Sequence, residues 1–373
     1  MKKNHNNKKM CLITNIAPHY RLPIFQEMNG QMNCEFYVGD HVRTPIKSID
    51  ENKLSGYKAT LHNIFIGSFY WQHHSVQLIF KPYQYYILDG EPYCVSSWVI
   101  LLLARFTGKK TIAWTHGWYG KEGFIKRLIK KTFYSLFNKL MIYSEYSIKL
   151  MEKQGFSSDK LFCIANSLDT DKELNIRRNL KETDIYTKHF GNENPTIIYC
   201  GRIQKRKKLE LILESIKLLN SQNYTINAVF VGKDIDNLHL EELSKLIGCP
   251  NQVWFYGPCY DDNILGELFY NANLCVSPGN VGLTAIHSLT FGCPVVTHNN
   301  FAYQMPEFES IIPNMTGDFF QQDDIKDLAE KIRKWTSLTI EERCQIRKNA
   351  YKEIDMKWNI HHQIEVMKNI ISS

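Results

Sequence analysis

The sequence alternates short apolar runs with longer stretches in which apolar residues recur at helical spacing. The runs that predict strands are CLITNI, CEFYVG, NIFIG, YYILD, TIAWTH, KLMIYS and LFCIAN in the first half, then TIIYCG, INAVFVG, VWFYG, LCVSP and PVVTH in the second half. Apolar strands joined by helices are typical of parallel sheets covered on both faces. The pattern therefore predicts an α/β chain with two successive doubly wound, Rossmann-like domains.

A polar, charged stretch after Asp169 separates the two halves of this pattern. We take residues 176–194 as the linker, which gives a first domain of residues 1–175 and a second domain of residues 195–354. The last helices, residues 355–373, are expected to cross back onto the first domain. A chain of 373 residues suits this division, because single cores usually stop growing at about 250–300 residues.

Residues 273–298, NLCVSPGNVGLTAIHSLTFGCPVVTH, predict a buried strand, a Pro-Gly-Asn turn, a helix and a second strand. Asn280 can cap this helix. Gly279 and Gly282 allow the first amides of the helix to approach a ligand closely, which favours an anion there.

The same helix carries a polar stripe that includes Asn280, Thr284 and His287. A stripe running back from a glycine-rich helix start is what a phosphate-plus-sugar ligand would need. The alternative is a capped core helix whose polar stripe faces solvent.

The segment GRIQKRKK, residues 201–208, follows a buried strand and places several cations at the start of a predicted helix. Cations at the positive end of a helix dipole repel it, and a bound anion would remove this conflict. A solvated basic turn is the alternative, but the position after a strand and a glycine favours the anion.

Ligands of open parallel sheets bind beyond the carboxyl ends of the strands. Polar residues predicted to stand there in the first domain are His19, Arg21, Asp89, Glu91, His116, Asn166 and Asp169. Metal candidates are weak, because Asp169 with Asp171 and Asp234 with Asp236 give only two carboxylates each. The pairs His73–His74 and His361–His362 lack an acidic or cysteine partner at ligand spacing. We therefore expect no metal.

The charge of the chain limits the class of binding partner only in part. The net charge of +7 and the pI near 8.7 suit an anionic ligand or surface, without separating nucleic acid from lipid or sugar phosphate.

The ten cysteines form no Cys-x-x-Cys pair, which favours the reduced thiols of a cytosolic protein. The basic start MKKNHNNKKM is not typical of a signal peptide. The most apolar segment, residues 95–106, is shorter than the roughly 20 residues of a membrane span.

Taken together, these residues resemble the retaining glycosyltransferases of family 4, which have the two-domain GT-B fold with the domains facing each other across a cleft. The resemblance covers nearly the whole chain. The family's Gly-Arg followed by a lysine matches Gly201, Arg202 and Lys207, and its Gly-x-Pro-Val-Val matches residues 292–296. Its cleft histidine corresponds to His116, and its Asn-x-x-Asp corresponds to residues 166–169.

The resemblance implies a transfer of a sugar from a nucleotide-diphosphate sugar to an acceptor hydroxyl, with retention and without a metal. It implies that Arg202 and Lys207 bind the diphosphate and that His116 orients the donor sugar. The other donor-binding residues that it implies are Gly201, Gly279, Asn280, Gly282, Leu283, Thr284, His287 and Asn166. The acceptor side is assigned to His19, Arg21, Asp89 and Glu91.

Two departures from the family pattern stand out. The family usually places a glutamate at each end of a seven-residue spacing, but these positions hold Gly279 and His287. We expect His287 either to replace the second glutamate or to be a packed core histidine. The family's glycine-rich loop after the first strand is replaced by APHYR. A sugar-nucleotide epimerase, a phosphorylase and a non-catalytic nucleotide-sugar binder on the same fold remain alternatives.

Residues 124–140, FIKRLIKKTFYSLFNKL, predict a basic amphipathic helix. Its apolar ridge is expected to be buried in the first domain, which leaves Lys126, Arg127, Lys130 and Lys131 to meet anionic lipid. The expected partners are a nucleotide sugar, a glycan acceptor carried on a lipid and an anionic membrane surface, but no nucleic acid. Such a protein would be cytoplasmic, at the inner face of the plasma membrane.

Overall fold

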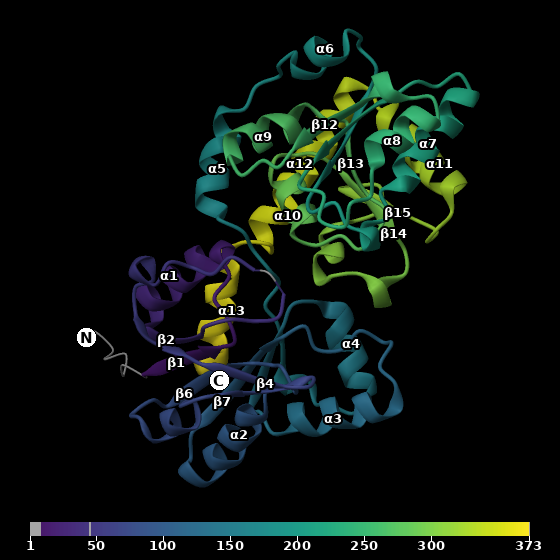
Figure 1. Ribbon diagram of the computed structural model, residues 1–373. Coiled ribbons are helices and arrows are strands. Elements are labelled where there is room, and N and C mark those ends of the chain that lie inside the picture. Colours follow the sequence, from purple (N-terminus) through teal and green to yellow (C-terminus); the bar gives the residue numbers. More distant parts are fainter. Residues whose placement is uncertain (1–8, 45, 373) are drawn as a thin grey trace. The chain divides into compact units, whose positions relative to one another are not determined.

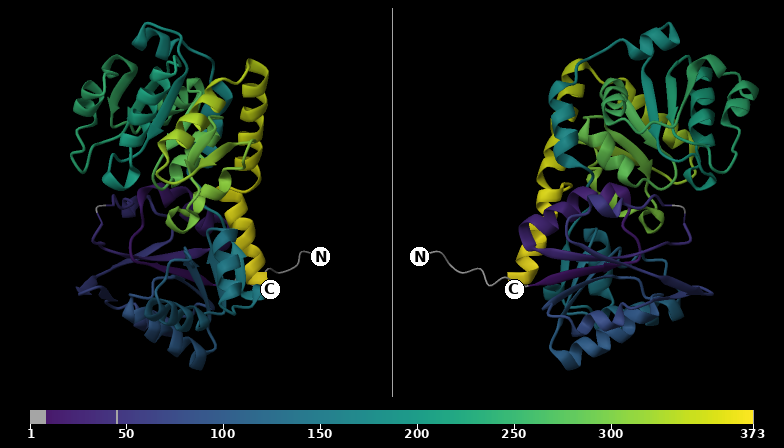
Figure 2. Two further views of the ribbon diagram at one scale, coloured as in Figure 1. Left: turned by 90° about the vertical axis from the view of Figure 1, so that its right-hand side faces the viewer. Right: turned by 60° about the vertical axis from the view of Figure 1, so that its left-hand side comes forward.

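The computed structural model describes residues 9–44 and 46–372. The basic start of the chain, residues 1–8, lies outside the described residues. The chain forms two compact units: the described residues up to Asp169 with those from Ile360 onward, and residues Thr170–Asn359. Each unit is a parallel sheet between layers of helices (Figure 1; Figure 2), as the apolar runs predicted.

The first unit contains a seven-stranded sheet in the order β3-β2-β1-β6-β7-β8-β9, and all neighbouring strands are parallel. Alternate residues of one strand enter different cores: Leu12 lies in one core and Ile13 in the other. The strands are β1 (Met10–Thr14), β2 (Cys34–Gly39), β3 (Tyr57–Leu61), β6 (Tyr85–Asp89), β7 (Lys110–Thr115), β8 (Lys139–Ile142) and β9 (Leu161–Cys163).

Helices from both ends of the sequence cover this sheet. On one face, α1 (Leu22–Met32) packs beside α13 (Ile360–Ser372), and Ile364 and Met367 enter the core under β1. The other face is covered by α2 (Val95–Thr107), α3 (Phe124–Ser135) and α4 (Glu145–Lys153). The last helix of the chain is therefore a part of the first unit.

The edge of the first sheet differs from the prediction. The run Asn63–Ile66 is β4, which pairs antiparallel with β5 (Phe69–Gln72) in a separate hairpin, and it does not join the parallel sheet. Its side chains Ile64 and Ile66 are exposed. The edge strand is β3, whose alternating exposure hid it in a search for apolar runs.

The predicted burial of the apolar ridge on α3 is wrong for the first half of the helix. Phe124, Ile125 and Leu128 are 78%, 73% and 58% exposed. Only the second half packs, through Phe133 and the neighbouring aromatic side chains. The helix also ends before Leu140, at Ser135, because the chain turns there into β8.

The second unit contains a six-stranded parallel sheet in the order β12-β11-β10-β13-β14-β15. The first five strands in the sequence were predicted, but the short β15 was not. The strands are β10 (Thr196–Cys200), β11 (Asn227–Val231), β12 (Val253–Gly257), β13 (Leu274–Ser277), β14 (Val295–His298) and β15 (Gly317–Phe320).

Two helical layers enclose this second sheet. One is formed by α7 (Glu210–Ser221), α8 (Leu240–Leu246) and α11 (Ile325–Thr336), which share one apolar core. The other layer is formed by α5 (Thr170–Asn179), α6 (Ile185–Phe190), α9 (Asp262–Asn271), α10 (Leu283–Thr290) and α12 (Ile340–Met356). The stretch 176–194, which we predicted as a linker, thus contains the end of α5 and all of α6, and both pack on α9.

The strand order changes direction at one point in each sheet. In the first sheet β1 lies between β2 and β6, and in the second sheet β10 lies between β11 and β13. The loops after such neighbouring strands diverge to opposite faces, which leaves a crevice at their carboxyl ends. Most of the predicted site residues stand at these two places.

Candidate active site

In the second unit, the loop after β10 and the loop after β13 touch through their backbones. The amide of Gly279 donates to the carbonyl of Lys207 at 2.8 Å, and the Lys207 ammonium donates to the carbonyl of Asn280 at 2.5 Å. A Cβ atom on Gly279 would lie 2.3 Å from the Arg206 carbonyl oxygen and 2.6 Å from the Lys207 Cα. A side chain at position 279 is therefore incompatible with this contact.

This explains one departure from the family pattern. The position that usually carries a glutamate lies against the backbone of the basic turn, η5 (Lys205–Lys207), and only glycine fits there. Position 201 also requires a glycine, because its φ is +146° at the turn out of β10. The structure thus brings Gly201, Lys207, Gly279 and Asn280 together, as predicted for the diphosphate loop.

Lys207 is a cation held in a poorly solvated place. Burial and the nearby positive charge of Arg206 together lower its pKa to about 8, while Glu307 opposes the shift. Arg202 stands on the same turn and is exposed. The Lys207 ammonium is poorly solvated, so an anion that binds beside it would compensate its positive charge.

The start of α10 corrects one prediction. The helix begins at Leu283 with Gly282 as its N-cap, and no side chain caps it. Asn280 therefore does not cap the helix, because the chain turns two residues later than predicted. The Asn280 side-chain oxygen is buried and accepts no hydrogen bond from the described residues. Among the first-turn amides of α10, that of Ala285 already donates to the Gly282 carbonyl at 2.9 Å, so an anion at this helix start would meet the amides of Leu283 and Thr284.

Residues beyond the predicted set hold this loop. The side-chain oxygen of Gln304 accepts from the amide of Val281 at 2.8 Å, and its nitrogen donates to Thr297 Oγ1 at 2.9 Å. The Thr297 hydroxyl lies 2.8 Å from the Ser277 carbonyl and 3.0 Å from the Gly279 carbonyl. Thr284 Oγ1 donates to the Cys200 carbonyl at 2.9 Å, which ties α10 to the end of β10. Gln304 carries no sequence signal that would have identified it.

His287 lies on the packed side of α10. Its Nε2 is 3.4 Å from a carboxylate oxygen of Glu173 on α5, and its ring contacts Phe269 and Phe291. The side chain is 14% exposed, and burial lowers its pKa to about 4. This environment is that of a core histidine in contact with a buried carboxylate, the second of the two expectations for this residue.

A hollow of about 460 Å³ lies beside the same loops, beyond the carboxyl ends of β10, β11 and β12. Its apolar floor is Phe255, which stacks on Phe230 with ring centroids 5.3 Å apart. Gly232 and Gly257 at the strand ends leave it open. The sequence placed these glycines at strand ends but did not indicate a pocket between them.

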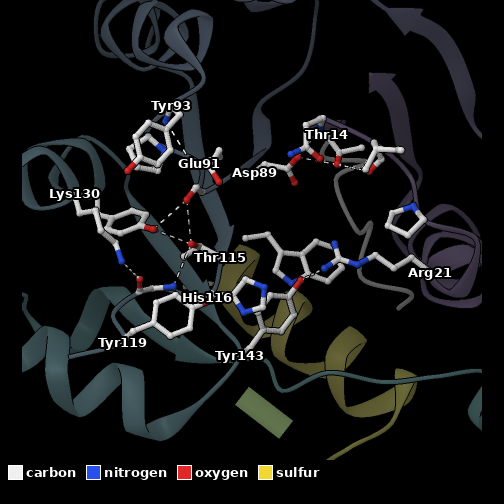
Figure 3. A pocket seen from close by; sticks show the side chains of 18 of the residues that line it. Thr14, Arg21, Asp89, Glu91, Tyr93, Thr115, His116, Tyr119, Lys130 and Tyr143 are labelled. Carbon is white, nitrogen blue, oxygen red and sulfur yellow. Dashed lines mark hydrogen bonds between the residues drawn. The ribbon is translucent and has the colours of Figure 1, made fainter. Parts of the chain in front are cut away.

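In the first unit, a pocket of about 340 Å³ lies at the corresponding point, between the ends of β1 and β6 (Figure 3). Asp89, the last residue of β6, accepts hydrogen bonds from Thr14 Oγ1 at 2.8 Å and from the amide of Asn15 at 2.5 Å. Burial raises the pKa of Asp89 and of Glu91, which also lines the pocket.

Arg21 supplies the opposite charge. Its guanidinium lies 4.8 Å from the Trp114 ring and 5.6 Å from the Tyr143 ring, and it donates to the Tyr143 hydroxyl. Asp89 raises the pKa of Arg21, as do Tyr143 and Tyr20 in spite of burial. The pocket therefore offers a fixed cation, two carboxyl groups and aromatic faces, which suits a polyhydroxylated ligand.

His116 follows β7 and lies in the same pocket, beside the rings of Tyr119 and Tyr143 (Figure 3). Burial, with the positive charges of Arg21 and Lys130, lowers its pKa to about 4. The imidazole is therefore neutral near pH 7. His116 Nδ1 and Trp114 Nε1 are buried and make no hydrogen bond to the described residues. A bound hydroxyl group can use this hydrogen-bonding capacity.

The loop that carries His116 is fastened by a buried ion pair. The Lys130 ammonium lies 2.7 Å from a Glu122 carboxylate oxygen and donates to the Gly117 carbonyl at 2.5 Å. The Glu122 carboxylate also accepts from the amides of Tyr119 and Gly120 at 2.9 Å. The prediction placed Lys130 on the solvent face of α3, and this is wrong, because the helix turns Lys130 toward the sheet.

Two other predicted residues lie elsewhere. His19 is exposed, does not line the pocket, and its Nδ1 lies 3.4 Å from the Lys47 carbonyl. Asn166 is buried in the loop after β9 and accepts from the amide of Ser167 at 3.0 Å. It belongs to the first unit, whereas the other predicted donor residues of its group belong to the second. Their roles as ligands stay predictions.

One discounted metal motif has a structural role. Asp234 accepts from the amides of Asp236 and Leu238 at 3.2 and 2.8 Å, and Asp236 accepts from the amide of Lys205 at 2.9 Å. These carboxylates fix the turn beside the basic loop. Asp is common in turns for this reason.

Comparison with known proteins agrees with this geometry. Residues 181–353, which include the basic turn and the loop after β13, match the family described as Glycosyl transferases group 1. This supports a group 1 glycosyltransferase. The match lies within the second unit and covers less than half of the chain.

Two curated relatives match part of this chain. One is described as an uncharacterized 41.2 kDa protein in the cps region of Klebsiella pneumoniae, with 24% identity over 61% of this chain and 60% of its own length. The other is the capsular polysaccharide biosynthesis glycosyltransferase CapM of Staphylococcus aureus, with 26% identity over 48% of this chain and 47% of its own length. The chain thus spans less than two thirds of either relative.

Solved structures match the whole chain. Anabaena HepE in complex with UDP has a TM-score of 0.74 and 14% identity, covering 98% of this chain and 100% of its own. A glycosyltransferase from Rickettsia africae has a TM-score of 0.74 and 16% identity, covering 98% and 97%. At this identity the likeness shows the fold alone, and that fold is GT-B.

Proposed function

We propose that the protein transfers a sugar from a nucleotide-diphosphate sugar to an acceptor hydroxyl during assembly of a surface polysaccharide. One observation carries this proposal: the Lys207 ammonium meets the loop from Gly279 to Leu283 at the switch point of the second sheet, where an anion would find a cation beside a helix start. Support for the donor class comes from HepE, which was solved with UDP and with UDP-glucose. Support for the pathway comes from the names of the capsular relatives.

In this proposal, Arg202 and Lys207 bind the diphosphate, assisted by the first-turn amides of α10. Arg donates in a fork and Lys acts as a point charge. The hollow floored by Phe255 receives the nucleobase, because an aromatic floor beside the phosphate site suits a flat ring. Asn280 Oδ1 is free to accept from a donor hydroxyl.

Catalysis would then consist of charge stabilisation at the leaving diphosphate and positioning of the two substrates. We infer retention of configuration and no need for a metal, since cations already neutralise the leaving group. His116 orients the donor sugar as a neutral imidazole. Arg21, Asp89 and Glu91 line the first-unit pocket and are assigned to the acceptor.

The test is a panel of UDP, GDP, ADP and CMP sugars, first by thermal shift and then by product analysis. A bound ligand at 100 times its dissociation constant stabilises by about 2.7 kcal/mol, which a thermal shift detects. Transfer to an added glycan, with the anomeric configuration read by NMR, is the expected result. A rearranged donor would indicate the epimerase alternative, and binding without turnover would indicate a non-catalytic binder.

We also propose that the first unit binds an anionic membrane surface, where a lipid-linked acceptor would be found. Phe124, Ile125 and Leu128 are exposed beside Lys126, Arg127 and Lys131. Between residues 76 and 144 the acidic residues are Asp89, Glu91 and Glu122. Two of these line the pocket and the third is paired with Lys130. The exposed charge of this layer is therefore positive.

Each cation near an anionic bilayer contributes about 1 kcal/mol to binding. The exposed apolar side chains would strengthen binding by inserting into the interface of the bilayer. No helix among the described residues has both the length and the apolar composition needed to cross a bilayer. Binding would thus be peripheral and weaker in high salt.

Sedimentation with vesicles of phosphatidylcholine and phosphatidylglycerol tests this membrane proposal. Changing Lys126, Arg127 and Lys131 to Gln should abolish binding at low salt, and changing Phe124 and Ile125 to Ser should weaken it. The matched control changes three exposed lysines of the second unit, Lys217, Lys326 and Lys348, to Gln. Equal sedimentation of the first variant and the control would contradict the proposal.

A further inference from the structure

At the edge of the first sheet, the carboxyl ends of β2 and β3 bring together Asp40, His41 and His62. His41 Nδ1 lies 2.7 Å from Asp40 Oδ1, and His62 Nδ1 lies 2.5 Å from Asp40 Oδ2. The three ligand atoms all lie within 4.8 Å of one another. Within the part of the chain that the structure describes, no other group of three or more His, Cys, Asp or Glu gathers its ligand atoms this closely.

We propose that these three residues bind a divalent transition-metal cation, with Zn²⁺ as the first choice. Two imidazole nitrogens and one carboxylate oxygen are a ligand set that zinc accepts, with water in the fourth position. Ligand atoms around tetrahedral zinc are roughly 3.3 Å apart, given bonds of about 2.0–2.1 Å. The two contacts between the imidazoles and Asp40 would open by less than about 1 Å, and any pair of ligand atoms that lies as far apart as 4.8 Å would close, to admit the ion.

The backbone holds all three positions in place before any ion binds. The amide of Asp40 donates to the Leu61 carbonyl at 3.0 Å, which fixes Asp40 beside the end of β3. The His62 carbonyl accepts from the amide of His73 at 2.8 Å. The His41 carbonyl accepts from Asn63 Nδ2 at 2.8 Å. Binding the ion would therefore cost little conformational entropy, because these backbone positions are already ordered.

The carboxylate and one ring are also oriented by neighbours. The amide of Asn63 donates to Asp40 Oδ1 at 3.0 Å, which orients the carboxylate. The His41 ring packs against Phe65 with centroids 5.3 Å apart. Partners of this kind fix a ligand's orientation and usually contribute 10–100-fold to metal affinity.

The ion would be structural and separate from the transfer reaction. Asn63, which contacts both Asp40 and His41, also donates to the Asn15 carbonyl at 2.8 Å. Asn15 in turn donates to Asp89 in the first-unit pocket. The cation would thus fasten the edge strand β3 and the hairpin β4–β5 to the wall of that pocket. It makes no contact with the residues assigned to the donor.

The test uses the full chain, stripped of metal with a chelator and desalted, and titrated with Zn²⁺ by calorimetry. We expect one ion per chain and a rise in Tm, and Co²⁺ in the same site should give the visible absorption of a tetrahedral ion with nitrogen and oxygen ligands. His41→Ala, His62→Ala and Asp40→Asn should each weaken Zn²⁺ binding at least tenfold. The matched control is His73→Ala with His74→Ala, a neighbouring imidazole pair outside the site.

Two outcomes would overturn the proposal: no stoichiometric binding to the stripped chain, or loss of the ion in the His73/His74 control with retention in the His41 and His62 variants. Circular dichroism of each variant without metal separates a lost ligand from a lost fold. If Asp40→Asn does not fold, the two histidine variants decide the question, because both rings are exposed.

Discussion

Lys130 and Glu122 form an ion pair 2.7 Å apart with 6% and 2% of their side chains exposed. The pair lies under the loop that carries His116, because the Lys130 ammonium also donates to the Gly117 carbonyl. Removing one member leaves the other charge buried without compensation, whereas removing both does not. The pair therefore determines the position of a predicted site residue that it does not touch.

We expect Lys130→Met to destabilise the first unit by about 3–5 kcal/mol, because Glu122 is left charged in a dry place. The double variant with Glu122→Gln should recover a large part of this loss. Denaturant unfolding of the three proteins forms a double-mutant cycle. Additive losses would mean that the two side chains do not interact energetically.

Gly279→Ala should disrupt the contact between the basic turn and the loop after β13. The new methyl group meets the Arg206 carbonyl at 2.3 Å, and overpacking of this kind costs about 1–3 kcal/mol. We expect weaker binding of the nucleotide sugar in a folded protein. The control is Gly30→Ala on α1, outside the predicted site, whose Cβ would have no atom within 4 Å. Equal donor affinity in both variants would contradict the assignment.

The pKa of Lys207, about 8, predicts a pH dependence of donor binding. Below pH 8 the ammonium is charged, and above it the charge is lost, so affinity should fall as the pH rises through about 8. A bound diphosphate raises the pKa again, so binding at pH 8 should take up a proton. Calorimetry in two buffers of different ionisation enthalpy measures this uptake.

Substitutions at the same turn separate charge from shape. Lys207→Ala should weaken donor binding by roughly 1.5–3 kcal/mol, the value of a hydrogen bond to a charged group. Lys207→Arg keeps the charge and should remove the pH dependence. Lys205→Ala is the control, because Lys205 lies on the same turn and is exposed. Proton uptake that persists in Lys207→Arg would assign it to another group.

Buried histidines predict loss of stability in acid. Burial lowers the pKa of His116 and of His298 to about 4, while the unfolded value is about 6.5. The unfolded chain therefore binds more protons between these values, and the free energy of unfolding should fall as the pH falls from about 6.5 to 4. Each pKa unit corresponds to about 1.4 kcal/mol.

His298→Asn should reduce the fall in the free energy of unfolding of the second unit as the pH is lowered. In the folded protein His298 Nδ1 accepts from the amide of Asn300 at 3.2 Å, a bond that needs the unprotonated nitrogen. Unfolding curves at pH 7 and pH 5 measure the difference, with His19→Asn as an exposed control. The idea fails if the variant and the wild type lose equal stability.

His287→Ala is expected to lower the stability of the second unit by about 1–3 kcal/mol and to leave donor affinity unchanged. Its ring packs between Phe269 and Phe291, and its nitrogen faces Glu173. Thermal unfolding and donor binding of the same variant give both readouts. A large loss of affinity at unchanged stability would instead make His287 a ligand of the ribose.

Activity in EDTA tests the expected metal independence. We expect full activity of the Asp40→Asn variant in EDTA, because that variant has already lost the proposed structural ion. Loss of its activity in EDTA, restored by manganese or magnesium, would show that the transfer reaction itself needs a metal.

The sequence identified most strands because a parallel strand buried on both faces is a continuous apolar run. It missed β3, which lies at the exposed edge and alternates, and it placed β4 in the parallel sheet although this strand belongs to a separate hairpin with two exposed isoleucines. The helix α3 was predicted, but its buried stripe was not: Lys130, Phe133 and Tyr134 are buried, whereas Phe124, Ile125 and Leu128 are exposed. Which stripe faces the sheet depends on how the helix is rotated, and periodicity alone does not give that.

The site was predictable where residues are close in sequence. Gly201 and Lys207 stand on one turn, and Gly279 to Thr284 on one loop, so motif spacing identified both. Gln304 and the group of Asp40, His41 and His62 were missed because only strand pairing brings them to their partners. The absence of a glutamate at position 279 was visible in the sequence, but its cause, the Arg206 carbonyl, was not.

The place of α13 in the first unit has a consequence for protein synthesis. Ile360, Ile364, Met367 and Ile370 fill the core under β1, and Gln363 donates to the Ala165 carbonyl at 3.0 Å. The second unit is continuous in sequence, so it can fold on the ribosome while one face of the first sheet is still uncovered. At about 5–20 residues per second, the intervening 190 or so residues take on the order of 10–40 seconds to translate. During that time one apolar face of the first sheet lacks the side chains of α13, and the unit that begins first is completed last.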